Sequence, residues 1–208
     1  MRIDVYHDLI CPWCRIGKAN LETALARWEG PLPEIHFQPF LLDADAPASP
    51  EPLLEYFQRT KGVSDPAPLF ARVEQAGAGA GVAFRFDIAQ SVQTREAHRL
   101  LLAARPEYQS ALLDVLHRVY FEEGANLASH AVLAQAAEEA GLDRAEALEL
   151  LEFGAGTLEL QAALRESHHL VQGGVPFFVF DNRYALSGAQ PPEVLLQAME
   201  AAAAAGIS

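Results

Sequence analysis

Both cysteines of this 208-residue chain lie within one four-residue stretch, Cys11-Pro12-Trp13-Cys14. The residues just before it, 2–6, alternate polar and apolar side chains, which predicts a half-buried strand. After it, apolar residues recur at helical spacing, at Leu21, Ala24, Leu25 and Trp28. A strand that runs into Cys-x-x-Cys and on into an amphipathic helix gives this motif a redox meaning, so the stretch predicts a reactive dithiol.

The start of a helix favours a reactive thiol. The first turn leaves backbone N–H groups unpaired and carries about half a positive charge, so a thiol held there is stabilised as the thiolate that attacks disulfides. We expect Cys11 to be this attacking sulfur and Cys14, one turn further in, to resolve the mixed disulfide. Pro12 suits the first helical position because its missing N–H would be unpaired anyway. Trp13 places a large apolar surface beside the sulfur, where it can contact the substrate.

A zinc site and a pair of inert cysteines are the alternatives to a dithiol. A closed structural zinc site needs four ligands, and the chain has no second cysteine pair. Its only pair of adjacent histidines, His168-His169, falls on the polar face of a predicted helix. We therefore expect no metal site and favour the redox dithiol.

Composition argues against several function classes. The chain carries 15 Lys and Arg against 28 Asp and Glu, a net charge of −13, whereas a nucleic-acid partner would require a clustered basic surface. No apolar run approaches the length of a membrane span, and the N-terminus leads directly into the first predicted strand, without a signal-type segment. We expect a cytoplasmic protein with no nucleic-acid or membrane partner, in which a disulfide is transient and catalytic.

The order of elements predicts an interrupted α/β fold. Residues 34–42 read as a second strand, with Pro39 at an edge or a strand end, which gives a strand–helix–strand unit that pairs in parallel. From about residue 51 to 152 the pattern is almost entirely helical. The expected helices in this part are 51–60, 66–76, 91–104, 106–123, 129–140 and 143–152, and only 82–86 looks extended.

The C-terminal part returns to mixed structure. Thr157 can cap a helix that runs to about residue 171 and is ended by Gly173-Gly174. Residues 175–180 and 183–187 then predict a hairpin joined by a turn at Asp181-Asn182, before a last helix. The resulting division is a discontinuous domain of residues 1–48 and 153–208 around an inserted all-helical domain of residues 49–152.

Three further features have ordinary interpretations. The run from Gly77 to Gly81 follows a predicted helix and lacks the lysine of a phosphate-binding loop, so it reads as a helix stop and turn. His98 lies in the middle of a predicted helix, where a histidine is most often structural or exposed. Asp8 reads as a surface carboxylate at a strand end, although its position before Cys11 would let it assist proton transfer. Asp8 and His98 are kept as candidate supporting residues.

Without the helical middle, the order is β-α-β followed by α-β-β-α, with Cys-x-x-Cys opening the first helix, which is the order of the thioredoxin fold. The helical insertion after the second strand resembles the DsbA family, and most of all its bacterial, cytoplasmic FrnE-type branch. The resemblance spans the chain and rests on four segments: Cys11-Pro12-Trp13-Cys14, Ala97-His98-Arg99-Leu100, the stretch from Gly174 to Phe180, and that from Ser187 to Glu193. It implies a DsbA-like α/β fold, thioredoxin-like with an inserted helical domain.

The resemblance also implies a second half of the site. In that family, the Val-Pro before the third strand carries a cis peptide bond that faces the cysteine pair, which maps onto Val175 and Pro176. Val175 would then offer its main chain to an extended peptide, and Pro176 would pack against the dithiol. The middle dipeptide departs from the pattern, because Pro12-Trp13 stands where DsbA itself has Pro-His. A strongly oxidising potential therefore does not carry over.

Two functions compete. The leading one is a thiol–disulfide oxidoreductase that acts on polypeptide or small-molecule thiols and disulfides, with no cofactor beyond the Cys11–Cys14 pair and with glutathione as an optional co-substrate. The alternative is a glutathione-dependent isomerase or transferase that resembles 2-hydroxychromene-2-carboxylate isomerase and kappa-class glutathione transferases, in which a serine takes the Cys11 role. A non-catalytic binding module that uses Trp13 and Val175 would leave the dithiol without a use. The oligomeric state is not indicated.

Overall fold

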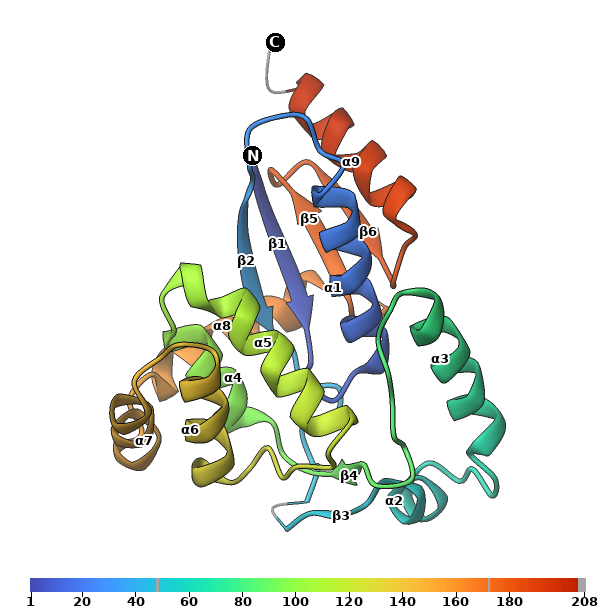
Figure 1. The fold of residues 1–208 in the computed structure, drawn as a ribbon, viewed down its shortest axis with the longest axis vertical. Coiled ribbons are helices and arrows are strands. Elements are labelled where there is room, and N and C mark those ends of the chain that lie inside the picture. The colour runs from blue at the N-terminus through green and yellow to red at the C-terminus, as the bar shows by residue number, and fades with distance from the viewer. Residues whose placement is uncertain (48, 172, 206–208) are drawn as a thin grey trace.

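A four-stranded mixed sheet forms the centre of the molecule in the structure, a computed structural model that describes residues 1–47, 49–171 and 173–205 (Figure 1). The strands run in the order β2-β1-β5-β6. Their bounds are β1 Arg2–His7, β2 Glu34–Pro39, β5 Phe177–Phe180 and β6 Tyr184–Ser187. β1 pairs with β2 in parallel and with β5 antiparallel, and β5 and β6 form the predicted hairpin. Pro39 ends β2, and β2 is an edge strand, so both expectations for this proline are confirmed.

Helices from the N-terminal and C-terminal parts of the chain cover the two faces of the sheet. Helices α1 (Pro12–Leu25) and α9 (Pro192–Ala205) lie side by side over the face to which Ile3 and Val5 point (Figure 1). Tyr6 points to the opposite face, where it packs with Val179 in a smaller buried cluster. Helix α8 (Thr157–Leu170) contacts β2. Alternation of side chains along the strands therefore divides the core into two layers.

The segment between β2 and α8 forms the helical insertion. Its helices are α2 Leu53–Thr60, α3 Ala67–Gly79, α4 Arg95–Ala103, α5 Pro106–Phe121, α6 His130–Glu139 and α7 Arg144–Phe153. Helix α5 contacts α4 and α6, and α6 contacts α7. This arrangement confirms the DsbA-like α/β fold with an inserted helical segment. Whether residues 49–152 fold as a domain of their own stays a prediction.

The insertion differs from the all-helical expectation at two points. Glu51–Pro52 forms a short strand, β3, that pairs antiparallel with Gln90–Ser91, β4. The helices predicted to begin at residues 51 and 91 therefore begin at Leu53 and Arg95. Residues 82–86, predicted to be extended, join no strand in the part of the chain that the structure describes. A two-residue ladder between segments about forty residues apart has no local periodicity that a sequence could show.

The start of α8 and the end of α3 also differ from the predictions. Thr157 is the first residue of α8 and not its cap; Gly156 holds the cap position with φ of 80°, and the Thr157 hydroxyl donates to the carbonyl oxygen of Gly154 at 2.6 Å. Helix α3 runs three residues past its predicted end and stops at Gly79. Gly81, with φ of 75°, then turns the chain in the left-handed region that glycine favours. The helix stop predicted for the glycine run therefore lies at its end, while Gly77, Ala78 and Gly79 still belong to α3.

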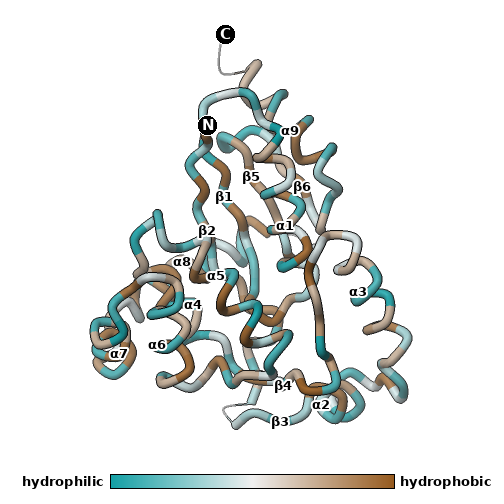
Figure 2. The backbone as a smooth tube through the Cα atoms, in the orientation of Figure 1, coloured by the Kyte–Doolittle hydropathy of each residue, from teal (hydrophilic) through white to brown (hydrophobic). Residues whose placement is uncertain are grey.

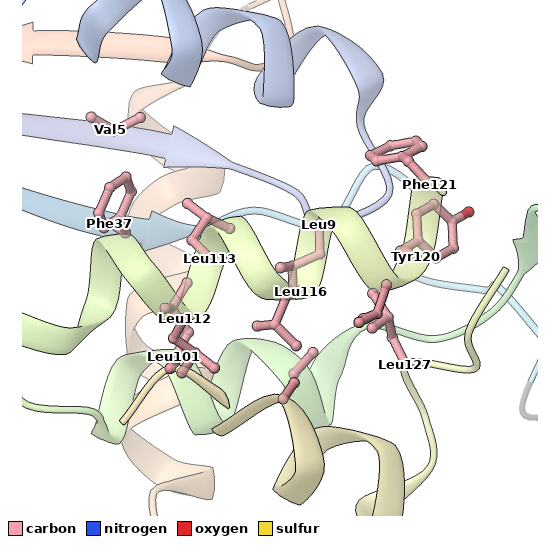
Figure 3. Close-up of a cluster of buried hydrophobic side chains, with 14 of the residues drawn as sticks. Val5, Leu9, Phe37, Leu101, Leu112, Leu113, Leu116, Tyr120, Phe121 and Leu127 are labelled. Atoms are coloured by element: carbon pink, nitrogen blue, oxygen red, sulfur yellow. The ribbon is translucent and has the colours of Figure 1, made fainter. Parts of the chain in front are cut away.

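One continuous hydrophobic core joins the sheet to the insertion. Val5 and Phe37 of the sheet belong to the same buried cluster as Leu113 of α5, and Figure 3 shows Phe37 beside Leu113, with Leu112 and Leu116 on the side of α5 toward α4. All five side chains are at most 5% exposed. On the outer helices, such as α3, hydrophobic residues alternate with hydrophilic ones (Figure 2). The apolar residues of α5 therefore pack against the sheet on one side and against the other insertion helices on the other. This packing holds the insertion at the end of the sheet where α1 begins.

Candidate active site

The two cysteines occupy the first turn of α1, at the end of β1. Cys11 is the N-cap residue with extended backbone angles, and α1 begins at Pro12, as expected. The carbonyl oxygen of Cys11 accepts hydrogen bonds from the backbone N–H groups of Cys14 at 3.0 Å and Arg15 at 3.3 Å. Both cysteines are free thiols in this structure. Cys11 therefore stands at the positive end of α1, although its side chain accepts no cap hydrogen bond from the first turn.

Burial alone does not distinguish the two thiols. Each cysteine is 3% exposed. The difference lies in the surroundings: Cys11 lines a cavity of about 440 Å³, and Cys14 is not among the described residues that line it. Burial, and then the adjacent Cys11, raise the pKa of the Cys14 thiol well above its usual range. Cys14 is thus held as a thiol behind a sulfur that faces the cavity.

The loop before β5 forms a second wall at the Cys11 sulfur. The Val175–Pro176 peptide bond is cis, as the family resemblance implied. Cys11 Sγ lies 3.6 Å from the carbonyl oxygen of Val175, to which the thiol can donate. Pro176 is buried and lies against Gly17, since a Cβ atom on Gly17 would come within 2.9 Å of its ring. Residues that are 164 positions apart in the chain thus meet at one sulfur.

The cavity is built jointly by α1, the insertion and the loop before β5. Pro12 and Trp13 line it beside Cys11, and Gly173, Gly174 and Val175 line it from the loop. The insertion supplies most of the remaining walls, mainly from α2 and α3, with Phe86 and Tyr120, and Ile10, Leu42 and Asp43 complete them. Four of the predicted site residues, Cys11, Pro12, Trp13 and Val175, therefore surround one space, while Pro176 and Cys14 lie behind its wall.

Asp8 is not the surface carboxylate that the sequence predicted. It is fully buried, and its carboxylate accepts hydrogen bonds from the Thr94 hydroxyl at 3.0 Å and the Leu42 backbone N–H at 2.8 Å. The His98 Nε2 atom lies 3.3 Å from the same carboxylate, so His98 is buried rather than exposed. The backbone carbonyl of Asp8 accepts from the Cys11 N–H at 3.1 Å. The two candidate supporting residues are thus partners, directly beneath the dithiol.

Two further histidines and a lysine extend this buried polar cluster. His7 and His117 are at most 2% exposed, and their ring nitrogens have no hydrogen-bond partner in the described part of the chain. The rings of His7 and His98 lie 5.2 Å apart. Burial, followed by repulsion from neighbouring His and Lys groups, lowers the pKa of His7 and of His117 well below the usual range. Lys18 is also buried and donates to Glu22 and Asp114.

The sequence analysis missed this cluster, although one signal was available. His117 falls on the apolar stripe of α5, four residues after Leu113 and three before Tyr120, so its position alone predicts burial. Within the described ranges no three His, Cys, Asp or Glu side chains form a group that could hold a metal ion. Nor do those ranges contain a helix long and apolar enough to cross a membrane.

Comparisons with known proteins place the chain among thioredoxin-fold oxidoreductases. A family profile described as a DSBA-like thioredoxin domain matches residues 2–200. The chain is 33% identical to a probable DsbA oxidoreductase, SCO1869, from Streptomyces coelicolor; the match covers 98% of this chain and 90% of that one, with a TM-score of 0.89. No curated protein matches.

Two more distant structures show the same fold. The cytosolic disulfide reductase DsbM from Pseudomonas aeruginosa is 21% identical over 97% of this chain and 98% of its own, with a TM-score of 0.67. A second DsbM structure contains GSH. A 2-hydroxychromene-2-carboxylate isomerase is 16% identical over 100% of both chains, with a TM-score of 0.69. At these identities the likeness concerns the fold.

Proposed function

Since the chain belongs to the family of DSBA-like thioredoxin domains, we propose that it is a thiol–disulfide oxidoreductase with Cys11 as the attacking and Cys14 as the resolving residue. The observation that carries the proposal is the position of Cys11. Its sulfur stands at the N-terminus of α1, faces a cavity, and lies 3.6 Å from the Val175 carbonyl oxygen. Cys14 is buried behind it with a raised pKa.

The reaction needs two exchange steps. The Cys11 thiolate attacks one sulfur of a substrate disulfide; the substrate S–S bond breaks, a mixed disulfide forms, and the first substrate thiolate leaves and takes up a proton. Cys14 then loses its proton and attacks the Cys11 sulfur. The mixed disulfide breaks, the second substrate thiol is released, and a Cys11–Cys14 disulfide remains. Run in reverse, the same steps oxidise a substrate dithiol.

The residues around Cys11 supply substrate contacts. Trp13 and Pro12 present apolar surface at the mouth of the cavity, and Val175 presents its backbone carbonyl group. Pro176 packs on Gly17 and so holds this loop against α1. We assign Pro12, Trp13, Val175 and Pro176 to substrate binding and its support.

Asp8 accepts and returns the proton of Cys14, and His98 supports Asp8 in this role. After burial and the adjacent Cys11, the charge of the Asp8 carboxylate also raises the pKa of this thiol. A buried carboxylate held by Thr94, Leu42 and His98 can accept the proton when Cys14 attacks and return it to a leaving thiolate. His98 positions Asp8 and does not itself face the sulfurs.

The alternative is a glutathione-dependent isomerase or transferase. It is supported by the shared fold of 2-hydroxychromene-2-carboxylate isomerase, and the GSH found with DsbM makes glutathione a candidate co-substrate. The second cysteine favours the oxidoreductase, because a conjugating enzyme has no step for a resolving thiol. The partners we propose are polypeptide or small-molecule thiols and disulfides, in a cytosolic setting like that of DsbM.

Insulin reduction and glutathione conjugation, measured side by side on the purified protein, test the proposal. We expect catalysed insulin reduction that is lost in Cys11→Ser, together with a two-electron dithiol potential that can be titrated against a thiol buffer. Conjugation of glutathione to an electrophile that survives Cys14→Ser, without any insulin reduction, would instead establish the alternative.

A further inference from the structure

The lining of the cavity beside Cys11 identifies a substrate class; this inference rests on the proposed oxidoreductase function. A volume of about 440 Å³ is in the range of pockets that hold a small molecule or one large side chain. Three phenylalanines of the insertion, Phe57, Phe70 and Phe86, line it. Phe70 stacks on Phe86 with a ring separation of 4.4 Å and meets Phe57 edge-on at 5.4 Å.

The other apolar walls complete an aromatic and aliphatic enclosure. Leu53, Leu69 and Val73 line it from α2 and α3, opposite Trp13 of α1. Aromatic rings attract further rings in edge-to-face and offset geometries, beyond the gain from burial. The side of the cavity away from the sulfur therefore favours a flat or bulky hydrocarbon group.

Four polar side chains that line the cavity, Asp43, Tyr56, Lys61 and Tyr120, already have hydrogen-bond partners within the protein. Tyr56 and Lys61 both donate to one carboxylate oxygen of Asp43, at 2.5 and 3.0 Å. The hydrogen bond to Asp43 is the main cause that raises the pKa of Tyr56 and of Lys61, which keeps both groups protonated. Tyr120 donates its hydroxyl to the Gln90 carbonyl at 2.6 Å.

Charge therefore counts against an anionic occupant. Lys61 is the single Lys or Arg among the described residues that line the cavity, and its charge is matched by Asp43. The whole chain carries a net charge of −13. A substrate carboxylate would have to displace Asp43 from Lys61 to find a cation.

From these contacts we propose that the cavity receives an uncharged aromatic or similarly large apolar group, attached within a few bonds of the sulfur that Cys11 attacks. The substrate class is disulfides with a neutral apolar body, and oxidised glutathione, which carries carboxylates, is a poor member of it. The group can belong to an aromatic side chain beside a cysteine in a peptide, or to a small aromatic disulfide.

Two matched pairs of symmetric disulfides test this inference with the reduced full-length protein. The first pair is the disulfide of N-acetyl-Phe-Cys-amide against that of N-acetyl-Ser-Cys-amide, which both release the thiol of a C-terminal cysteine amide and carry no charge. The second is bis(2-phenylethyl) disulfide against bis(2-hydroxyethyl) disulfide. Burial of one aromatic group predicts a kcat/KM advantage on the order of tenfold to a hundredfold for the aromatic member. Oxidised glutathione should fall below both peptides.

The two pairs of disulfides also show whether the apolar group belongs to a peptide or to a small molecule. A preference confined to the peptide pair assigns the group to a peptide side chain, and a preference confined to the second pair assigns it to a small molecule. Equal rates within both pairs overturn the inference while leaving the oxidoreductase proposal intact. If none of the disulfides is turned over in a Cys11-dependent reaction, the proposed function itself fails.

A matched variant locates the effect in the cavity. Leu69 lines the cavity and is 47% exposed, whereas Leu170 is 46% exposed and does not line it. Leu69→Gln should reduce the ratio of kcat/KM for the Phe-containing disulfide to that for the Ser-containing one by roughly threefold to tenfold. Leu170→Gln should leave this ratio unchanged. An equal loss of preference in both variants would contradict the placement of the aromatic group.

Discussion

Asp8 shows how a single residue can link the dithiol to the core. Its side chain is fully buried, one turn before Cys11, and is held by Thr94, Leu42 and His98 from two other segments. A buried carboxylate requires such partners to remain in the core, and its charge then acts on any thiol nearby. The raised pKa of Cys14 is partly a result of this charge, after burial and the effect of Cys11.

Asp8→Asn tests whether the Asp8 carboxylate takes part in proton transfer to and from Cys14. Thr94 and Leu42 donate to different oxygens of the Asp8 carboxylate, so the single amide oxygen of asparagine can keep only one of these hydrogen bonds, and it cannot take up a proton. We expect turnover of a disulfide peptide to slow on the order of tenfold or more, and its pH profile to shift. In a Cys11→Ser background, Cys14 should be alkylated at lower pH than in the parent, because a repelling charge has been removed.

Asp4 provides the control for this prediction. It lies on β1, the strand that ends just before Asp8, and is 4% exposed, but it pairs with Arg2 and Gln38 away from the dithiol. Asp4→Asn should leave the pH profile of exchange in place. An unchanged profile in Asp8→Asn would remove Asp8 from the proton path.

At the scale of elements, the close approach of α1 to the loop before β5 defines the site. Gly17, one turn after Cys14, allows this contact because a Cβ atom there would meet the Pro176 ring at 2.9 Å and Phe178 at 3.2 Å. Both neighbours are buried, so they have little room to move. The distance between Cys11 and Val175 thus depends on a residue that lines no part of the cavity.

Gly17→Ala should push α1 away from this loop. We expect a loss of about 1–3 kcal/mol in the free energy of unfolding from overpacking, and slower disulfide exchange. Gly79→Ala is the matched control, because Gly79 is also helical and nothing lies within 4 Å of its Cβ position. Alanine there should stabilise the protein by up to about 1 kcal/mol. Urea unfolding of both variants measures the contrast, and equal stabilisation would show that Gly17 has no packing role.

The elements also show what the sequence alone could predict. The dithiol, the first turn of α1 and the β5–β6 hairpin were predicted because each signal is local: a four-residue motif, a 3.6-residue period, and a turn at Asp181-Asn182. The Asp8 partners Thr94 and His98 lie 86 and 90 residues away, so no spacing reveals them. The start of α4 was misplaced for the same reason. Thr94 holds its cap position but gives its hydroxyl to Asp8 instead of capping the helix.

At the scale of the whole molecule, the insertion and the sheet form a single functional unit. The hydrophobic core is continuous between them, and the cavity has Cys11 and Val175 on one side and α2 and α3 on the other. The polar cluster of His7, His98 and His117 lies at the same junction. A change in the charge of these histidines should therefore affect folding of the whole chain.

Stability should fall as the pH drops below about 6.5. His7 and His117 have pKa values in the folded state that lie well below the ordinary value of 6.5, so the unfolded chain binds more protons in this range. Each histidine should contribute a slope of about 1.4 kcal/mol per pH unit. Urea unfolding between pH 5 and 8 measures it. His117→Leu should remove one histidine's share of the slope, whereas His169→Leu, at an exposed position of α8, should keep the parent slope.

The central claim, that Cys11 attacks and Cys14 resolves, is tested most directly by trapping the mixed disulfide. Cys14→Ser and Cys11→Ser are each incubated with a peptide disulfide, and the adducts are located by mass spectrometry. We predict that Cys14→Ser accumulates a stable mixed disulfide on Cys11, because the resolving thiol is absent, and that Cys11→Ser accumulates almost none, because Cys14 is buried away from the cavity. Equal trapping on Cys14 in the Cys11→Ser variant would contradict the assignment of roles.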